Sequence, residues 1–327
     1  MVQPLANGTV NLLNEQDGLY TMLLRGIRNG KRIERTEIIT SVSRGVNPYT
    51  DWKAFLDNAH NPDLRYIMSN TTEAGIAYST TPFPENECPA SFPAKVTAFL
   101  YERYKKFGAS HESGMVIIPC ELIEDNGTAL RDCVVRHSID WELEDGFLEW
   151  LDGSNYFCNT LVDRIVPGYP KDEIETLTKK IGYEDKLLVS GELFHLWVIQ
   201  ANPKIKDELP FVRAGLNVVW TDDITPYRTL KVRILNGAHT MMAIPSLLAG
   251  IDSVKGTVED PVMKGFIREG LFNEILPTLD ASGEVKMDYA RNVLERFRNL
   301  FIKHYLSSIT LNSVSKFRVR VLPSILR

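Results

Sequence analysis

The sequence predicts an α/β N-terminal domain with a parallel sheet, followed by a mainly α-helical C-terminal domain. Between residues 64 and 137, short apolar strands alternate with polar loops and helices, a pattern typical of parallel sheets. From about residue 226, the strand signals give way to long segments with helical apolar periodicity. The length of 327 residues also favours about two domains. We place them at 1–155 and 156–327.

The N-terminal domain begins with a predicted β-hairpin. Residues 18–25 form an apolar strand, 29–30 is an Asn-Gly turn signal, and β-branched residues recur through 31–42. A short helix is expected over 51–60, where Asp51 is placed to cap its first turn.

Two strand-loop-helix units follow and define the parallel sheet. Residues 64–68 and 114–119 are short apolar strands, and each is followed by a polar loop. The helix after the first strand is expected over 92–107, and the helix after the second ends near His137.

Polar residues at the ends of these two strands are candidates for binding a cofactor. A strand that ends in small polar residues suits a ligand at the carboxyl edge of a parallel sheet. A plain strand-to-helix turn is the alternative. The cofactor-binding candidates are Ser69, Asn70, Thr71 and Glu73, with Glu121 and Asn126 as weaker ones.

The pattern changes after about residue 149. Residues 159–168 are expected to cross between the domains, 172–182 to form a charged helix, and 197–200 and 218–220 to form short strands. The predicted helices of the C-terminal half cover 229–249, 261–275, 285–297 and 302–314. The charges of the third helix, which include Arg296, indicate a solvated face.

One stretch of the helical half concentrates three polar side chains in a mostly apolar run. At ~100° per residue, Lys231, His239 and Asn236 fall at about 0°, 80° and 140° and share one broad face. A desolvated lysine can act as a general base, an amide can donate to a developing oxyanion, and a histidine can orient either group. From spacing alone, an ordinary helix with a solvent-reaching lysine and a satisfied histidine is the alternative.

Composition argues against several classes of protein. The net charge of -5 argues against a nucleic-acid partner. No apolar run approaches ~18 residues, so no membrane partner is expected, and the N-terminus lacks a secretion signal. The four cysteines form no CxxC pair and the six histidines show no ligand spacing, so no metal is expected. Free thiols favour a cytoplasmic location.

No GxGxxG fingerprint follows any predicted strand. If the N-terminal domain binds a dinucleotide, its first strand, phosphate loop and first helix, ~30 residues of a βαβ unit, are expected before Met1. The sequence is therefore expected to be part of a longer enzyme.

Two motifs resemble the mannitol dehydrogenase family, the polyol-specific long-chain dehydrogenases. Lys231-x4-Asn236-Gly-Ala-His239 resembles the family's active-site helix, and Asn159-Thr-Leu-Val-Asp163-Arg-Ile resembles its second fingerprint. The two occur in the expected order. Further segments resemble the branch of the family that acts on hexuronic acids, namely 16–21, 69–75, 117–123, 162–170, 222–227 and 316–320.

The resemblance implies a Rossmann-like N-terminal domain, NAD as cofactor, and metal-independent interconversion of a hexuronate and its aldonate. In this family pattern Lys231 would be the general acid/base, Asn159 and Asn236 would polarise the carbonyl, and His239 would hold substrate hydroxyls and the lysine.

The resemblance also implies a clamp for the substrate carboxylate. A carboxylate is best held by cationic donors, whereas surface cations are often merely solvated. The candidates are Lys303, His304, Lys316, Arg318 and Arg320, of which His304, Lys316 and Arg320 are our substrate-binding predictions. Mannitol dehydrogenases carry acidic residues shortly after the strand at 197–199, where this sequence has Gln200-Ala-Asn-Pro. This departure favours a substrate with its own negative charge over a plain polyol.

Several alternatives stay open at this point. Sequence logic does not separate epimeric hexuronates, so a reductase that yields mannonate is an alternative. No acid stands near Gln3 to select NAD over NADP. A non-catalytic chain that binds sugar acids is the alternative from another class. The protein is expected to be a monomer or a weak homo-oligomer.

Overall fold

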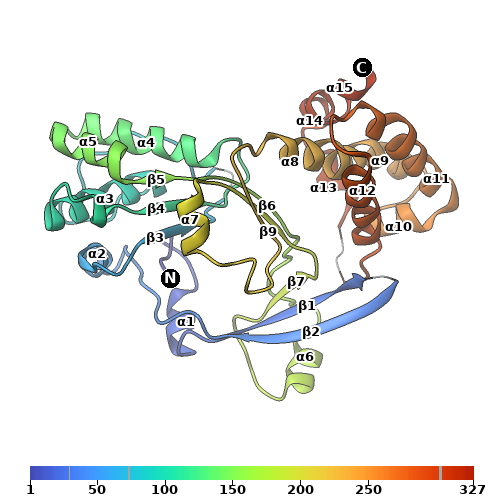
Figure 1. Ribbon diagram of the computed structural model, residues 1–327. Helices are drawn as coiled ribbons and strands as arrows, with labels where there is room; N and C mark the ends of the chain where they lie inside the picture. Colours follow the sequence, from blue (N-terminus) through green and yellow to red (C-terminus); the bar gives the residue numbers. More distant parts are fainter. Residues whose placement is uncertain (29, 73, 302–303) are drawn as a thin grey trace.

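The computed structural model describes residues 1–28, 30–72, 74–301 and 304–327. An α/β part built on short sheets leads into a helical part at the C-terminal end (Figure 1). The predicted fold class is therefore confirmed.

The N-terminal hairpin forms as expected and joins a later strand. β1 (Tyr20–Arg28) pairs antiparallel with β2 (Lys31–Ile39), and β7 (Val189–Glu192) pairs parallel with β1 on its other edge. The second strand ends at Ile39, before the predicted end at residue 42. Asp51 caps α2 (Trp52–Asp57) by accepting a hydrogen bond from the Ala54 amide at 2.8 Å.

The second sheet is the parallel one. Its order is β3 (Tyr66–Ser69), β4 (Val116–Pro119) and β5 (Tyr156–Phe157). Side chains of β4 and of the helices α3, α4 and α5 bury one core together, including Leu100, Ile117, Leu130 and Phe147. The helices are α3 (Phe92–Phe107), α4 (Asn126–Asp140) and α5 (Asp145–Ser154). Because β5 pairs with β4, this sheet continues past the predicted boundary at 155/156, which itself stays a prediction.

The third sheet has the order β6 (Asn159–Asp163), β8 (Leu196–Gln200) and β9 (Val218–Thr221). Ile118 of β4, Cys158 and Ile199 of β8 share a buried cluster that holds the second and third sheets together. The remaining elements of the first 211 residues are α1 (Val10–Glu15), η1 (Asn58–His60), η2 (His111–Ser113), α6 (Ile174–Ile181) and α7 (Pro203–Glu208).

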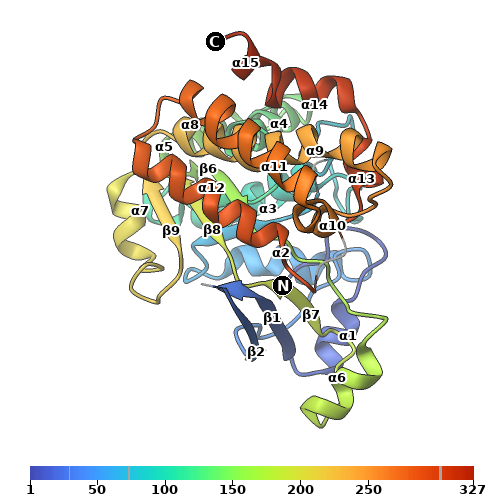
Figure 2. The ribbon, with the colours of Figure 1, turned by 90° about the vertical axis from the view of Figure 1, so that its right-hand side faces the viewer.

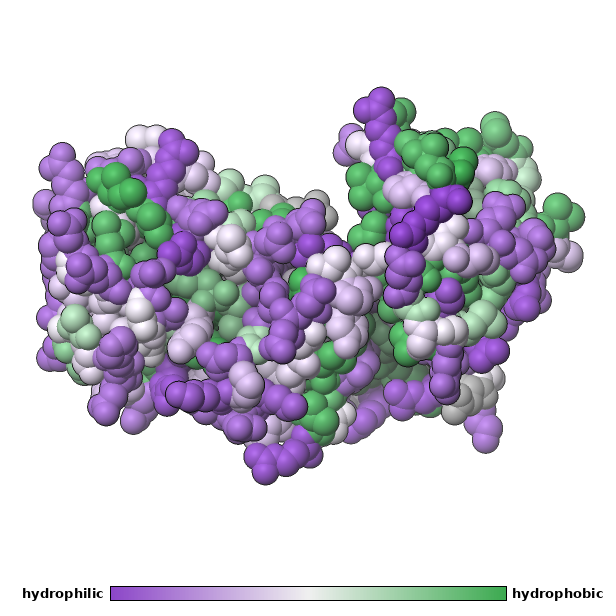
Figure 3. All heavy atoms as spheres, turned by 45° about the horizontal axis from the view of Figure 1, so that its top comes forward, coloured by the Kyte–Doolittle hydropathy of each residue, from purple (hydrophilic) through white to green (hydrophobic). Residues whose placement is uncertain are grey.

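The C-terminal part packs its helices around one apolar core. Its elements are α8 (Thr225–Leu230), η3 (Lys231–Asn236), α9 (Gly237–Leu248), α10 (Val254–Glu259), α11 (Pro261–Glu269), η4 (Gly270–Ile275), η5 (Leu276–Thr278), α12 (Gly283–Phe297), α13 (Leu306–Thr310), α14 (Ser313–Arg320) and α15 (Leu322–Ile325). In Figure 2, α12 crosses in front of β6 and β8. Figure 3 shows the surface hollowed between the helical part and the rest.

Two predicted helices differ from the structure. The helix expected over 302–314 is wrong, because Leu311 leaves the helical conformation and Asn312 has φ 58°, a left-handed conformation that separates α13 from α14. Residues 302–303 lie outside the described chain. The helix expected over 229–249 starts at Thr225, and residues Lys231–Asn236 form a π-helical turn within it. A π turn advances by less than 100° per residue, so the angles expected for Asn236 and His239 do not hold.

No helix in the described part of the chain is both long enough and apolar enough to cross a bilayer.

Candidate active site

A cavity of about 380 Å³ lies between the α/β part and the helical part. Segments far apart in the sequence meet there, from the loops after β3 and β4 to β6, η3, α9 and α14. The lining residues that bear on chemistry are Asn70, Asp163, Arg164, Lys231, Asn236, His239, His304, Lys316 and Arg320. The structure therefore brings all three polar residues of the 231–239 stretch to one cavity.

Lys231 is the half-buried amine of this cavity. It lies at the start of the π turn, and its Nζ donates a hydrogen bond to the Val162 carbonyl at 2.7 Å. Burial lowers the pKa of Lys231 below its ordinary value, and the nearby Asp163 carboxylate opposes part of that shift. The unprotonated amine, which can accept a proton from a substrate, is therefore present at lower pH than in a solvent-exposed lysine.

His239 is a buried, neutral imidazole on α9. Its side chain packs against Phe297 and His304, with ring centroids 4.5 and 4.8 Å away. Burial holds the pKa of His239 well below its usual range, and the neighbouring His304 lowers it further. Within the described chain its buried Nε2 has no hydrogen-bond partner, so that nitrogen is available to a substrate hydroxyl.

Cations dominate the charged part of the lining. Lys316 donates to the Ile309 carbonyl at 2.9 Å, and Arg320 donates to the Thr240 hydroxyl at 3.3 Å. Arg164 also lines the cavity, although the sequence did not single it out. Cations from separate segments thus converge where an anionic ligand would be stabilised.

The other candidate cations are placed differently. Arg318 is exposed and does not belong to the described lining, so it is not part of the clamp in this structure. Lys303 lies outside the described residues.

Asn159 is not brought into this cavity. Its amide oxygen accepts a hydrogen bond from the Thr128 amide at 2.9 Å, and its side chain lines a neighbouring pocket with Gln200 and Asp222. Asn159 stands three residues before Val162 on β6, which places it ~10 Å from the lysine's hydrogen-bond acceptor. Its role at the reacting carbonyl stays a prediction.

The cofactor-binding candidates separate into two groups. Asn70 lines the cavity at the carboxyl end of β3. Glu121 instead accepts hydrogen bonds from the Ser69 hydroxyl at 2.9 Å and from the Thr71 amide and hydroxyl at 3.0 and 2.7 Å. Ser69, Thr71 and Glu121 therefore fix the sheet edge on which Asn70 stands.

Asn126 is corrected from ligand to anchor. Its side chain is fully buried and donates to the Pro119 and Glu121 carbonyls, while its amide oxygen accepts from the Thr160 amide at 2.8 Å. Its polar atoms are thus occupied inside the protein, which leaves none to face a cofactor. Glu73 lies outside the described residues.

Arg296 was predicted on a solvated helix face, and that prediction is wrong. Its side chain is 6% exposed and pairs with Asp163 and Glu192. The signal that could have found it is helical spacing, since Tyr289, Val293 and Arg296 recur on one face of α12, and Val293 is buried.

Comparisons with known proteins place both parts of the chain in one family. The family model described as the mannitol dehydrogenase Rossmann domain matches residues 2–211, and the mannitol dehydrogenase C-terminal domain matches residues 223–327. Altronate oxidoreductase of Bacillus subtilis (strain 168) is 49% identical over 325 residues, covering 99% of this chain and 67% of that protein. Altronate oxidoreductase of Halalkalibacterium halodurans is 45% identical, with coverage of 99% and 63%. The chain thus spans about two thirds of the length of these relatives.

Two solved structures share the fold. A D-sorbitol dehydrogenase in substrate-free form superposes with a TM-score of 0.84 at 24% identity, covering 99% of this chain and 68% of that one. The mannitol 2-dehydrogenase of Pseudomonas fluorescens, a ternary complex with NAD and D-mannitol, gives a TM-score of 0.72 at 22% identity, with coverage of 98% and 65%.

Proposed function

Since the chain belongs to the mannitol dehydrogenase family, we propose that it is an NAD-dependent oxidoreductase that interconverts D-altronate and D-tagaturonate. The observation that carries this proposal is the cavity in which a half-buried lysine faces a set of cations. The lysine supplies proton transfer, and the cations match the carboxylate that distinguishes a sugar acid from a neutral polyol. The altronate oxidoreductases among the relatives support the same substrate.

Lys231 acts as the general acid/base. In oxidation its free amine takes the proton of the substrate hydroxyl at the carbon that is oxidised, and in reduction its ammonium returns a proton to the nascent alkoxide. The lowered pKa of Lys231 makes the free amine accessible nearer to neutral pH, as a general base requires. The Val162 carbonyl, 2.7 Å from Nζ, holds the amine in place in both directions.

Asn236 and His239 act on the oxygens of the substrate. Asn236 would donate its amide hydrogens to the oxygen that gains negative charge, because it lines the same cavity as Lys231. His239 would meet a neighbouring hydroxyl with its unpartnered Nε2. As a neutral imidazole it can either donate or accept a hydrogen bond, according to its tautomer.

Lys316, Arg320 and His304 would receive the carboxylate end of the substrate. The pKa of His304 is lowered by burial, so it acts as a neutral hydrogen-bonding group beside the two cations. Arg164 adds a further positive charge to the lining. Asn159 keeps its predicted role as a second amide that polarises the carbonyl. For this role its side chain must first break its hydrogen bond with Thr128.

The residues at the edge of the parallel sheet fit the nicotinamide end of NAD. The carboxyl ends of β3 and β4 open onto the cavity through Asn70, Cys120 and Leu122, which is where parallel sheets bind such ligands. Asn70 would hold the carboxamide by hydrogen bonds, and Leu122 would cover a ring face. NAD supplies the hydride acceptor when it is bound.

The test is a set of initial rates with purified protein. We expect NADH oxidation with D-tagaturonate and NAD reduction with D-altronate, both abolished in Lys231→Met. Turnover of D-fructuronate alone would replace the proposed substrate by its epimer. No turnover of either acid, together with a thermal shift caused by altronate, would indicate a chain that binds sugar acids without catalysis.

A further inference from the structure

A buried ionic cluster lies directly behind Lys231. Arg296 of α12 donates to both carboxylate oxygens of Asp163 on β6, at 2.8 and 2.9 Å. It also donates to both oxygens of Glu192 on β7, at 2.8 and 3.0 Å. The three side chains are only 6%, 5% and 1% exposed, so water does not weaken these contacts.

The cluster spans three elements and fixes the end of β6. Tyr289, on the same face of α12 as Arg296, donates a hydrogen bond from its hydroxyl to Asp163 at 3.0 Å. Glu192 accepts a hydrogen bond from the Ile165 amide at 2.7 Å. The residue next to Asp163 is Val162, whose carbonyl accepts the hydrogen bond of Lys231. The position of the amine therefore depends on a strand end that Arg296 holds.

We propose that Arg296 is a positioning residue for Lys231. Arg296 binds Asp163 and Glu192, so that the Val162 carbonyl holds the Lys231 amine and the Asp163 carboxylate does not pair with that amine. The inference rests on the proposed role of Lys231 as the acid/base. It assigns to α12 a part in catalysis although Arg296 is not among the residues that line the described cavity.

The charge balance around Lys231 supports this assignment. Asp163 favours the ammonium form of the lysine, whereas Arg296 and Arg320 disfavour it. Despite its burial, Arg296 has its pKa raised by the two carboxylates, so it stays charged. Within the described residues, the titratable and charged groups around the amine are Asp163 of β6, Arg164 just after it, Glu192 of β7, His239 of α9, Tyr289 and Arg296 of α12, His304, and Lys316 and Arg320 of α14.

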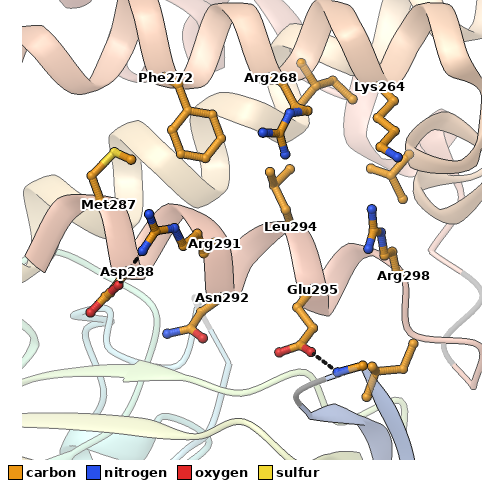
Figure 4. Close-up of a pocket in the computed structure, with 14 residues that line it drawn as sticks. Lys264, Arg268, Phe272, Met287, Asp288, Arg291, Asn292, Leu294, Glu295 and Arg298 are labelled. Carbon is orange, nitrogen blue, oxygen red and sulfur yellow. Dashed lines mark hydrogen bonds and ion pairs between the residues drawn. The ribbon is translucent and has the colours of Figure 1, made fainter. Parts of the chain in front are cut away.

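The opposite face of α12 supplies a matched control. Figure 4 shows Arg291 and Glu295 of this helix, and Arg298 just after its end, around a surface pocket shared with α11, where Glu295 accepts from the Gly30 amide at 3.0 Å. Arg298 is exposed there. Arg298→Met is thus the same change two residues further along the chain, away from the cluster. Arg25→Met is the buried control, since Arg25 is 6% exposed and pairs with Glu173 at 2.5 Å.

The experiment measures the pH midpoint at which the Lys231 amine becomes reactive toward acetic anhydride, read by mass spectrometry of the full chain. This readout does not require enzymatic turnover. We expect the midpoint to rise by about one pH unit in Arg296→Met, because Asp163 is left to favour the ammonium. We expect it to fall in Asp163→Asn, which removes that carboxylate while Glu192 still pairs with Arg296.

The control variants complete the test. Arg298→Met and Arg25→Met should leave the midpoint unchanged, even where Arg25→Met lowers the melting temperature. Arg296→Lys, which keeps the charge, should restore most of the wild-type midpoint. If Arg296→Met does not fold, Asp163→Asn and Arg296→Lys decide the question.

Midpoints that stay fixed, or that move in the same direction in Arg296→Met and Asp163→Asn, would overturn the positioning role. Inactivity of the wild-type chain on both acids would instead overturn the proposed function, and the labelling midpoints would still report on the cluster.

Discussion

Replacing Lys316 by glutamine tests whether the cavity recognises a carboxylate. The lysine Nζ donates to the Ile309 carbonyl at 2.9 Å on a helix that borders the cavity. The glutamine side chain is one atom shorter and uncharged, and its amide still carries N–H donors. The substitution therefore removes the positive charge while it keeps a hydrogen-bond donor at this position.

The size of the effect follows from the loss of the charged hydrogen bond between Lys316 and the substrate carboxylate. A hydrogen bond to a charged group contributes ~1.5–3 kcal/mol, and each ~1.4 kcal/mol changes affinity tenfold. Because Lys316 is half-buried and partly screened by water, we expect the lower end, about a tenfold rise in KM for D-altronate. A neutral polyol offers no carboxylate, so its KM should change by less than ~2-fold.

The assay compares initial rates of NAD reduction with D-altronate and with D-mannitol for the wild type and the variant. Arg318→Gln is the control, because Arg318 lies on the same helix but is exposed and outside the described lining. An equal rise in KM for both substrates, or an equal effect of Arg318→Gln, would refute the carboxylate clamp.

The remaining predictions concern the amine, the amides and the buried imidazole. Because the pKa of Lys231 is lowered, kcat/KM for altronate oxidation should rise with pH up to that pKa and then level off, whereas reduction should fall above it; pH profiles in both directions check this. Asn236→Ala should lower kcat by ~10²–10³ with little change in KM, as measured by steady-state kinetics. Asn159→Ala should match that loss if Asn159 reaches the carbonyl during turnover, and a loss below tenfold would restrict it to its bond with Thr128. The pKa of His239 is lower in the folded state than its unfolded value of ~6.5. The contribution of this histidine to the free energy of unfolding is therefore fully present above pH ~6.5 and decreases as the pH falls below that value. Urea unfolding of His239→Gln between pH 7 and 5 should show this slope reduced, by at most ~1.4 kcal/mol per pH unit.

Local patterns in the sequence were sufficient for most of the fold. The hairpin over β1 and β2, the cap at Asp51 and the bounds of α3 all follow from turn signals, a capping residue and helical periodicity, and each is confirmed. The family resemblance carried by the motifs at 159–165 and 231–239 is confirmed as well. These features depend on residues close together in the chain, which is why the sequence reports them.

Other predictions failed because the outcome depended on partners elsewhere in the chain. Asn126 lies in a polar loop after a strand, which is typical of a ligand site. Its side-chain amide is nevertheless hydrogen-bonded to the Pro119 and Glu121 carbonyls and to Thr160. Arg296 belongs to a run of charges that is typical of a solvated face, yet two carboxylates from β6 and β7 bury it.

The sequence by itself determined the order of the elements and the chemical groups of the site, with Lys231, Asn236 and His239 within one segment. Only the tertiary structure decided what surrounds that segment. It brings Arg164, Lys316 and Arg320 together in one cavity and sets the Arg296 cluster behind the amine. The physical reason is that periodicity and capping are local, whereas burial, charge pairing and the pKa of Lys231 depend on groups tens to more than a hundred residues away.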